Sequence, residues 1–156
     1  MISYGSEVIV DRPHAEVAAY IVDPSTHRAW MGDVADIEAL TAGAVGVGSR
    51  YRYLIKKGSM AINLTMRVVT LSDRAVEYAT EPGGPLDWQA KIGFEPIDAG
   101  RTRVTSTGSI SMRGLRRLLE PFMAREVRSG EAAELTALKG VLEAPSGARD
   151  LAVAGA

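Results

Sequence analysis

Cysteine is absent from this sequence, histidine occurs only twice, and positive and negative charges are nearly balanced. Without cysteine the chain forms no disulfide, no thiolate nucleophile and no cysteine-ligated metal or iron–sulfur site. The 18 Lys and Arg residues against 19 Asp and Glu residues give a formal net charge of −1. Nucleic acids and anionic membranes attract basic surfaces, so the overall charge predicts no nucleic-acid partner.

Long hydrophobic runs are missing as well. No apolar run approaches the roughly 20 residues that cross a bilayer, so we expect no stable membrane insertion. Residues 1–7 lack the basic segment followed by an apolar segment that marks a secretory signal. Together these absences predict a cytoplasmic location.

The residues that usually carry hydrolytic or metal chemistry are sparse. Neither His14 nor His27 lies in a Gly-x-Ser-x-Gly elbow, which argues against a Ser–His–acid site. The acidic residues between positions 23 and 38 show no established metal-ligand spacing. The glycines of residues 43–48 precede a strand, whereas phosphate-binding loops precede a helix. We therefore predict no metal site and no cofactor.

The length of 156 residues suffices for one domain with a substantial core. We assign this single domain to residues 1–143. Residues 144–156 are small, with polar and apolar types in no regular period, and we expect a disordered tail there.

Hydrophobic periodicity predicts the order of the secondary-structure elements. Residues 7–10 form a strand, Pro13 opens a helix over residues 14–22, and a second short helix covers residues 25–31. From residue 34 to residue 112 the period changes to two, which predicts six antiparallel strands joined by turns. Their expected ranges are 36–40, 50–56, 60–68, 75–80, 88–94 and 102–112.

Residues 114–143 return to a helical period, with an apolar stripe and charged residues elsewhere. Pro121 must kink this helix or mark its true start, because proline removes a hydrogen bond and clashes with the preceding turn. A sheet with one apolar face needs a cover, and only this terminal helix is long enough to provide it. The sequence therefore predicts an α+β fold. A curved seven-stranded antiparallel sheet wraps around a long C-terminal helix, and two short helices follow the first strand.

Alternation within the strands also predicts which side chains face the long helix. A shift of one residue would reverse every assignment. Tyr51 and Tyr53 are expected inside rather than Arg50 and Arg52, because burying an unpaired guanidinium is very costly. The other inward residues are Met60, Ile62, Leu64, Met66, Trp88, Ala90, Ile92 and Phe94, and the outward residues are Asn63, Thr65, Gln89 and Lys91.

Arginines are concentrated near the start of the predicted long helix. Such residues usually form the solvated face of a helix, here paired with Glu120 and Glu126. The alternative is contact with an acidic partner or a membrane surface. The residues concerned are Arg113, Arg116, Arg117, Arg125 and Arg128.

Five short segments, read together, carry a family resemblance. They are RPHAEV at 12–17, DP at 23–24 followed by Trp30, GVGSRYR at 46–52, GRTRVT at 100–105 and LTALKGVLE at 135–143. In this order and spacing the chain, over residues 6–143, resembles the START/Bet v 1-like (SRPBCC) superfamily and its polyketide cyclase/dehydrase-type members. The resemblance implies a helix-grip fold with a hydrophobic cavity between the sheet and the C-terminal helix. It transfers no catalytic residue, because the cyclase-type members share no single catalytic motif.

Aromatic and soft side chains on the inward faces suit a flat, partly oxygenated ligand. We expect the mouth of the cavity near residues 57–59 and 81–85, because glycine-rich hairpin loops can move without breaking core contacts. The predicted ligand-binding residues are Trp30, Tyr51, Tyr53, Leu64, Met66, Tyr78, Trp88, Ser106, Leu119, Phe122 and Met123.

The resemblance and these residues lead to one preferred function and two alternatives. The preferred function is binding of a hydrophobic or aromatic small molecule, with cofactor-free polyketide cyclase/dehydratase activity. Catalysis would then fold a flexible substrate, and Tyr51, Tyr53 or Tyr78 would donate hydrogen bonds to an enolate. The alternatives are a non-catalytic lipid or small-molecule carrier or sensor, and a cochaperone-like interaction module. A homodimer is compatible with the sequence.

Overall fold

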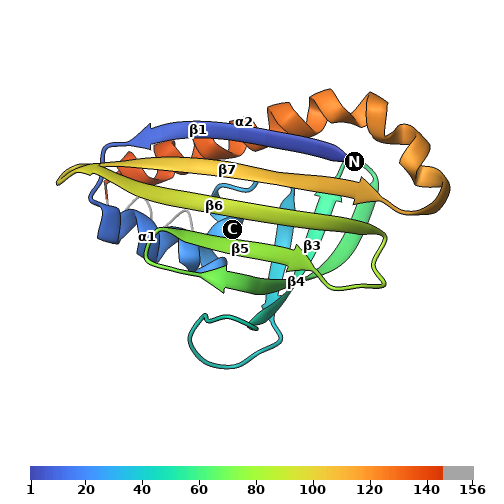
Figure 1. Ribbon diagram of the computed structural model, residues 1–156, viewed down its shortest axis with the longest axis horizontal. Coiled ribbons are helices and arrows are strands. Elements are labelled where there is room, and N and C mark those ends of the chain that lie inside the picture. Colours follow the sequence, from blue (N-terminus) through green and yellow to red (C-terminus); the bar gives the residue numbers. More distant parts are fainter. Residues whose placement is uncertain (146–156) are drawn as a thin grey trace.

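Seven antiparallel strands form one curved sheet in the computed structural model, which describes residues 1–145 (Figure 1). The strands are β1 (Ile2–Val10), β2 (Val34–Ala39), β3 (Arg50–Lys57), β4 (Met60–Leu71), β5 (Ala75–Thr80), β6 (Leu86–Asp98) and β7 (Arg101–Met112). Their order in the sheet is β1-β7-β6-β5-β4-β3-β2. β1 therefore pairs with β7, and the chain crosses from β1 at one edge of the sheet to β2 at the opposite edge.

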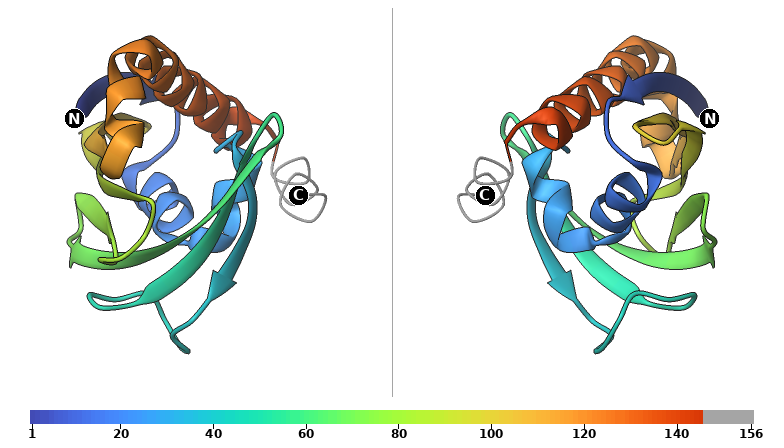
Figure 2. Two further views of the ribbon diagram at one scale, coloured as in Figure 1. Left: turned by 90° about the vertical axis from the view of Figure 1, so that its right-hand side faces the viewer. Right: turned by 90° about the vertical axis from the view of Figure 1, so that its left-hand side faces the viewer.

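Four helical segments complete the fold: α1 (His14–Val22), η1 (Pro24–Ala29), η2 (Gly114–Leu119) and α2 (Glu120–Glu143). The short helices α1 and η1 carry the chain from the β1 edge to the β2 edge. Figure 2 shows the sheet curving around these short helices, with α2 lying across the open side of the curve. This arrangement confirms the predicted α+β fold with a long C-terminal helix gripped by the sheet. No helix among residues 1–145 is long and apolar enough to span a membrane.

The two short helices begin as their sequences predict. The carbonyl of Pro13 accepts hydrogen bonds from the backbone N–H groups of Glu16 and Val17, at 3.1 Å each, and starts α1. The carboxylate of Asp23 accepts from the backbone N–H of Ser25 at 3.0 Å and caps η1. The second segment is a 3₁₀ helix that ends at Ala29, two residues before the predicted end.

β1 is longer than predicted. It begins at Ile2 rather than at residue 7, and it pairs with β7 in continuous register from Ile2 opposite Ile110 to Val10 opposite Thr102. The serines and Gly5 in residues 2–6 weaken the apolar alternation that signals a strand. Pairing with β7 and burial of Ile2 and Tyr4 outweigh that weak local preference.

The predicted inward and outward faces are confirmed. Leu64 and Met66 on β4 and Ile92 and Phe94 on β6 are buried, whereas Lys91 is exposed and pairs with Glu77 across 2.9 Å. Trp88 is half-buried on the inner face. Met60, the first residue of β4, is exposed because it lies at the tip of the hairpin.

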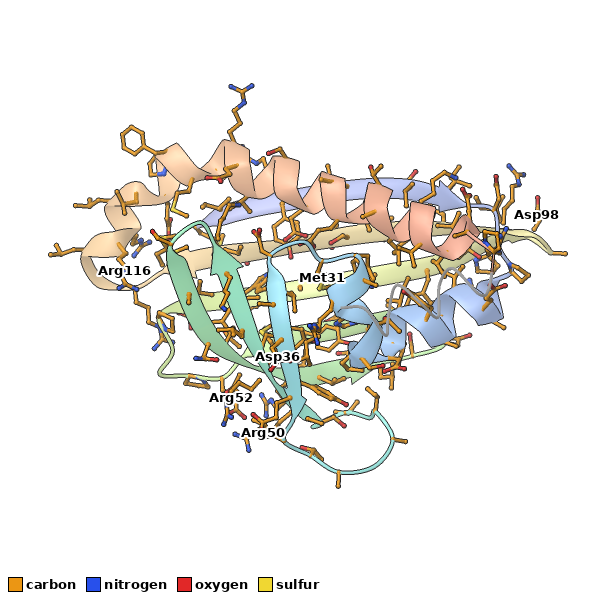
Figure 3. The ribbon with its side chains drawn as sticks, turned by 180° about the vertical axis from the view of Figure 1, so that it is seen from behind. Met31, Asp36, Arg50, Arg52, Asp98 and Arg116 are labelled. Carbon is orange, nitrogen blue, oxygen red and sulfur yellow. The ribbon has the colours of Figure 1, made fainter. Side chains whose placement is uncertain are left out.

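Alternation along β3 likewise follows the prediction. Tyr51 and Tyr53 are each only 5% exposed. Arg50 and Arg52 point outward from the sheet (Figure 3), where they pair with Glu81 and Glu38.

The segment from residue 114 to residue 143 is interrupted near Pro121, as its sequence predicts. The interruption separates η2 from α2, with Pro121 in the first turn of α2, where a missing N–H is tolerated. The buried carboxylate of Glu120 accepts from the backbone N–H of Met112 at 2.7 Å and also contacts the amino group of Met1. This carboxylate therefore fixes the start of α2 against the end of β7.

The apolar stripe of this segment differs from the prediction at its N-terminal end. Leu135, Leu138 and Leu142 are buried, but Leu115, Leu118, Leu119 and Phe122 are exposed. Figure 1 shows the reason, because η2 and the first turns of α2 extend past the end of β7, where no strand lies beneath them. The predicted tail at 144–156 lies outside the described residues from position 146 onward.

Candidate functional site

An aromatic cluster lies on the inner face of the sheet beside η1. The ring of His27 has its centroid 5.4 Å from that of Trp30 and 6.0 Å from those of Tyr53 and Tyr78. All four side chains are buried. Such spacings are typical of packed aromatic rings, so η1 places a polar ring inside an aromatic shell.

The hydrogen bonds of His27 determine its tautomer. Its Nε2 lies 2.9 Å from the carbonyl oxygen of Ile21, which can only accept, so Nε2 carries the proton. Burial lowers the pKa of His27 to about 4, and the ring is neutral at pH 7. The unprotonated Nδ1 then accepts from the Tyr53 hydroxyl, 2.8 Å away. The hydroxyl proton of Tyr53 is therefore committed to His27.

Tyr78 differs from Tyr53 in having a free hydroxyl. Its oxygen is buried and has no hydrogen-bond partner among residues 1–145, and the same is true of the indole Nε1 of Trp30. Burial raises the pKa of Tyr78 above its usual value, so the hydroxyl keeps its proton. An unsatisfied buried donor costs about 1–3 kcal/mol. The cluster thus holds two buried donors, the Tyr78 hydroxyl and the Trp30 indole N–H, each able to donate to an oxygen atom of a bound molecule.

Small residues separate Tyr78 from a second polar group on the inner face. The register places Tyr78 opposite Ala90, Ala90 opposite Gly108, and Gly108 opposite Tyr4. Three strand spacings therefore separate the two tyrosine backbones, roughly 14 Å. Gly108 is required here, because a Cβ at this position would lie 2.4 Å from the Tyr4 hydroxyl. The Tyr4 side chain therefore reaches over Gly108, which leaves Ala90 as the small residue beside Tyr78.

The Tyr4 hydroxyl accepts a hydrogen bond from the indole Nε1 of Trp88 at 2.9 Å. Burial is the main reason that its pKa is raised, and the charges of Glu131 and Glu134 raise it further. Tyr4 and these two carboxyl groups of α2 therefore face one another across the interior.

Glu131 and Glu134 are two half-buried titratable groups of α2. The Ser106 hydroxyl on β7 donates to Glu131 at 3.4 Å. Burial raises the pKa of Glu131 to about 7 and that of Glu134 to about 8. The negative charges of Glu131 and Asp33 add to the rise at Glu134, and Lys57 opposes it. Both groups therefore exchange protons near neutral pH, as general acids and bases do.

An ion-pair bridge joins the β3–β4 hairpin to α2. The Lys57 ammonium lies 3.3 Å from the carboxylate of Asp33 and 3.2 Å from that of Glu126. All three side chains are partly exposed, so water weakens these contacts. The bridge lies beside the hairpin turn of residues 57–59. The sequence predicts the mouth of the cavity near this turn, and the position of the mouth stays a prediction.

Seven of the predicted ligand-binding residues are buried in the interior; one directly follows η1 and six lie on four strands. Trp88 and Met123 are half-buried. Leu119 and Phe122 are 52% and 84% exposed, which corrects the expectation that they bound the interior volume. The buried seven are Trp30, Tyr51, Tyr53, Leu64, Met66, Tyr78 and Ser106.

Sequence reasoning missed four polar residues of this interior: Tyr4, His27, Glu131 and Glu134. A signal for the two carboxyl groups was present, since Glu131 and Glu134 each lie four residues before a buried leucine of α2, Leu135 and Leu138. Residues four apart share one face of a helix. The spacing therefore placed both carboxyl groups on the side that faces the sheet.

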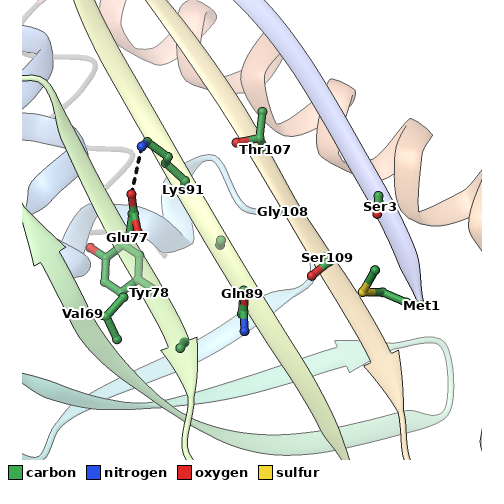
Figure 4. Close-up of a pocket in the computed structure, with 12 residues that line it drawn as sticks. Met1, Ser3, Val69, Glu77, Tyr78, Gln89, Lys91, Thr107, Gly108 and Ser109 are labelled. Carbon is green, nitrogen blue, oxygen red and sulfur yellow. Dashed lines mark ion pairs between the residues drawn. The ribbon is translucent and has the colours of Figure 1, made fainter.

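Two of the surface hollows border residues of the sheet. The larger, of about 550 Å³, lies on the outer face of the sheet and is bordered by Glu77, Gln89 and Lys91 (Figure 4). The smaller, of about 250 Å³, lies between Asp23 and the β2–β3 loop, beside Tyr51. Neither lies between the sheet and α2. Among the described residues, no group of three or more acidic, His or Cys side chains is placed to hold a metal ion.

Comparison with protein families gives one match that covers nearly the whole domain. The family model described as polyketide cyclase / dehydrase and lipid transport matches residues 1–143. A comparison with curated protein sequences finds no match.

Solved structures share the fold at low sequence identity. A START superfamily protein from Mycobacterium smegmatis has a TM-score of 0.78 and 12% identity, over 92% of this chain and 98% of that one. The Zhui aromatase/cyclase from Streptomyces sp. R1128 has a TM-score of 0.73 and 19% identity, over 90% and 93%. A Thermus thermophilus protein, TTHA0849, has a TM-score of 0.76 and 14% identity, over 90% and 96%. These similarities confirm the helix-grip fold of the START/Bet v 1-like superfamily.

Proposed function

Because this chain belongs to the polyketide cyclase / dehydrase and lipid transport family, we propose that it binds a hydrophobic small molecule between the inner face of the sheet and α2. The observation that carries the proposal is the unpartnered, buried hydroxyl of Tyr78 beside the small residue Ala90. Natural interiors rarely leave such a group unsatisfied without a reason, and a place for a ligand or a water molecule is a common one.

The surroundings of Tyr78 indicate the chemistry of the ligand. The rings of Tyr53 and Trp30 and the side chain of Met66 offer aromatic and soft apolar surface. The neutral hydroxyl of Tyr78 donates to an oxygen that accepts, such as a carbonyl. Trp30 Nε1 provides a second donor. A planar ring system that carries a carbonyl group fits both features.

A pair of matched ligands tests the binding site. The ligands are 2-acetylnaphthalene, which has a carbonyl oxygen, and naphthalene, which has none. We expect Tyr78→Phe to weaken binding of 2-acetylnaphthalene about fivefold, the usual value of one hydrogen bond, and to leave naphthalene binding unchanged. Titration followed by tryptophan fluorescence measures both affinities. Equal effects on the two ligands, or no binding of either, would contradict the proposal.

A catalytic role is supported by a separate observation, the pair Glu131 and Glu134 with pKa values near 7 and 8. Cyclisation of a poly-β-ketone begins when a base removes a proton from a carbon between two carbonyl groups. The later loss of water needs an acid that protonates the departing hydroxyl. One ionised and one protonated carboxyl group supply these two functions at neutral pH. We therefore extend the proposal to polyketide cyclase/dehydratase activity.

A turnover assay distinguishes an enzyme from a carrier. The assay follows dehydration of a β-hydroxy ketone to the conjugated enone by its ultraviolet absorbance. We expect Glu131→Gln and Glu134→Gln to lower kcat at least tenfold, while Glu126→Gln, an exposed position on the same helix, leaves it unchanged. Binding of the ketone without turnover by the unaltered protein would favour a carrier or sensor.

A further inference from the structure

Exposed apolar side chains are concentrated at one end of the molecule. Four of the eight large hydrophobic side chains exposed among residues 1–145 fall within the eight residues 115–122. They are Leu115 (86% exposed), Leu118 (73%), Leu119 (52%) and Phe122 (84%), which we call the apolar tip. Soluble proteins rarely expose contiguous apolar surface of this kind unless it binds a partner, a ligand or a membrane.

Positive charge is interleaved with the apolar tip. The segment from residue 113 to residue 128 contains five arginines and two glutamates in a chain whose net charge is −1. Arg113 is held by Asp87, and the Arg128 guanidinium donates to the carbonyl of Ser3. Arg116 and Arg125 form no ion pair with any residue of the described chain, and Figure 3 shows Arg116 at the end of the molecule formed by η2. The unpaired cations therefore lie within the same segment as the apolar side chains.

The β3–β4 hairpin belongs to the same end of the molecule. Its Lys57 contacts Glu126 of α2 at 3.2 Å, and the adjacent Met60 is 45% exposed. The hairpin therefore adds a further apolar side chain and a further cation near the apolar tip.

We propose that η2 and the first turn of α2 dock onto an anionic bilayer surface. The bilayer interface offers acyl chains directly beneath a layer of phosphate groups. Leucine and phenylalanine side chains enter the acyl region while arginine side chains extend to the phosphates, as in amphipathic segments that lie in the interface.

The pattern of the segment favours a bilayer over a protein partner. Protein interfaces place apolar residues at a core depleted of charge. Here the order Leu115, Arg116, Arg117, Leu118 sets two cations between two of the apolar side chains. Extension of the segment past the end of β7 also lets its side chains reach a flat surface before the rest of the domain does (Figure 1).

Vesicle flotation tests the proposal with the full chain. The probes are vesicles of phosphatidylcholine alone and vesicles with about one third phosphatidylglycerol, at low and high salt. We expect binding to the anionic vesicles only, and weaker binding at high salt because salt screens the attraction. Addition of vesicles should also shift the emission of a Phe122→Trp variant to shorter wavelength, as a ring that enters the acyl region requires.

Paired variants separate the apolar and electrostatic contributions. Leu118→Ser with Phe122→Ser removes apolar side chains, and Arg116→Gln with Arg125→Gln removes cations. We expect each pair to reduce vesicle binding at least tenfold. For the arginine pair, this follows because one arginine near an anionic surface contributes about fivefold. Val47→Ser, at an apolar position that is 69% exposed on the β2–β3 loop, is the matched control and should leave binding unchanged.

Three results would overturn the proposal: no binding to either kind of vesicle, binding that the serine variants leave intact, or a dimer in ultracentrifugation that the serine variants dissociate. The last result would assign the apolar tip to a second copy of the chain. All of the substituted side chains are exposed, so unchanged melting temperatures confirm that the variants fold.

Discussion

The Tyr53 hydroxyl donates a hydrogen bond to Nδ1 of His27 across 2.8 Å, in a part of the interior that water does not reach. The nearby Tyr78 ring packs edge-on against the same imidazole, yet its hydroxyl has no partner among the described residues. The two tyrosines look equivalent in the sequence, but the hydroxyl proton of Tyr53 is used within the protein, whereas that of Tyr78 is available to a ligand.

This difference predicts opposite effects on stability. Tyr53→Phe leaves Nδ1 of His27 buried and unsatisfied, so we expect the free energy of unfolding to fall by about 1–3 kcal/mol. Tyr78→Phe removes a hydroxyl that has no partner, so the free energy of unfolding should stay the same or rise. Urea unfolding of the ligand-free proteins measures both values. A larger loss for Tyr78→Phe than for Tyr53→Phe would contradict this assignment.

The lowered pKa of His27 predicts how the stability of the protein depends on pH. Its pKa is about 4 in the folded protein, below the ordinary value of 6.5, so between these pH values the unfolded chain binds a proton that the folded chain does not. Stability is therefore lost as pH falls from about 6.5 to 4, by up to about 3 kcal/mol. Urea unfolding at a series of pH values measures the loss, and the imidazole signals in NMR should show His27 neutral down to about pH 4. A His27 midpoint near 6.5 would contradict its burial.

The raised pKa values of Glu131 and Glu134 predict the opposite pH dependence, a loss of stability as pH rises. Their pKa values are raised to about 7 and 8, so the folded protein holds protons that the unfolded chain has already released. Their contribution to stability therefore declines as pH rises from about 4.5 to 8. Glu131→Gln should remove part of this decline and lower the pKa of Glu134, because the charge of Glu131 contributes to its rise. The exposed Glu126→Gln is the control, and an unchanged slope in Glu131→Gln would contradict the prediction.

Two glycine substitutions test the close approach of Tyr4 to β7. A Cβ at Gly108 would lie 2.2 Å from the Gln89 carbonyl oxygen and 2.4 Å from the Tyr4 hydroxyl, so Gly108→Ala should displace Tyr4 from Trp88. A Cβ at Gly140 on α2 meets nothing within 4 Å, and Gly140→Ala should stabilise the helix by about 0.5–1 kcal/mol. Thermal unfolding compares the two. Equal melting temperatures would contradict the packing of Tyr4 over Gly108.

The sequence predicted the fold well because its strands alternate cleanly. One face of β4 and of β6 carries apolar side chains at every second position, and burial of Phe94 with exposure of Lys91 follows from that period. β1 was underestimated because Ser3, Gly5 and Ser6 have little strand preference of their own. Its length depends on β7, a partner about 100 residues away that no local pattern reveals.

The candidate site was harder to predict, for two physical reasons. Leu119 and Phe122 fit the apolar period of residues 114–143, but the period does not show where the sheet beneath a helix ends. His27 is a polar residue whose burial depends on two specific partners, Ile21 and Tyr53, and single-residue patterns carry no information about such pairs.

Pairing of β1 with β7 has a consequence for the order in which the protein can fold. Ile2 leaves the ribosome well before its partner Ile110, which follows more than 100 residues later. Until then β1 has no strand partner, and the closing step must bring together two distant parts of the chain, which slows folding. The α1–η1 crossing and β2–β6 can assemble before that step. Completion of the sheet, and with it the interior that Tyr4, Trp88 and Glu131 share, therefore belongs to the last stage of folding.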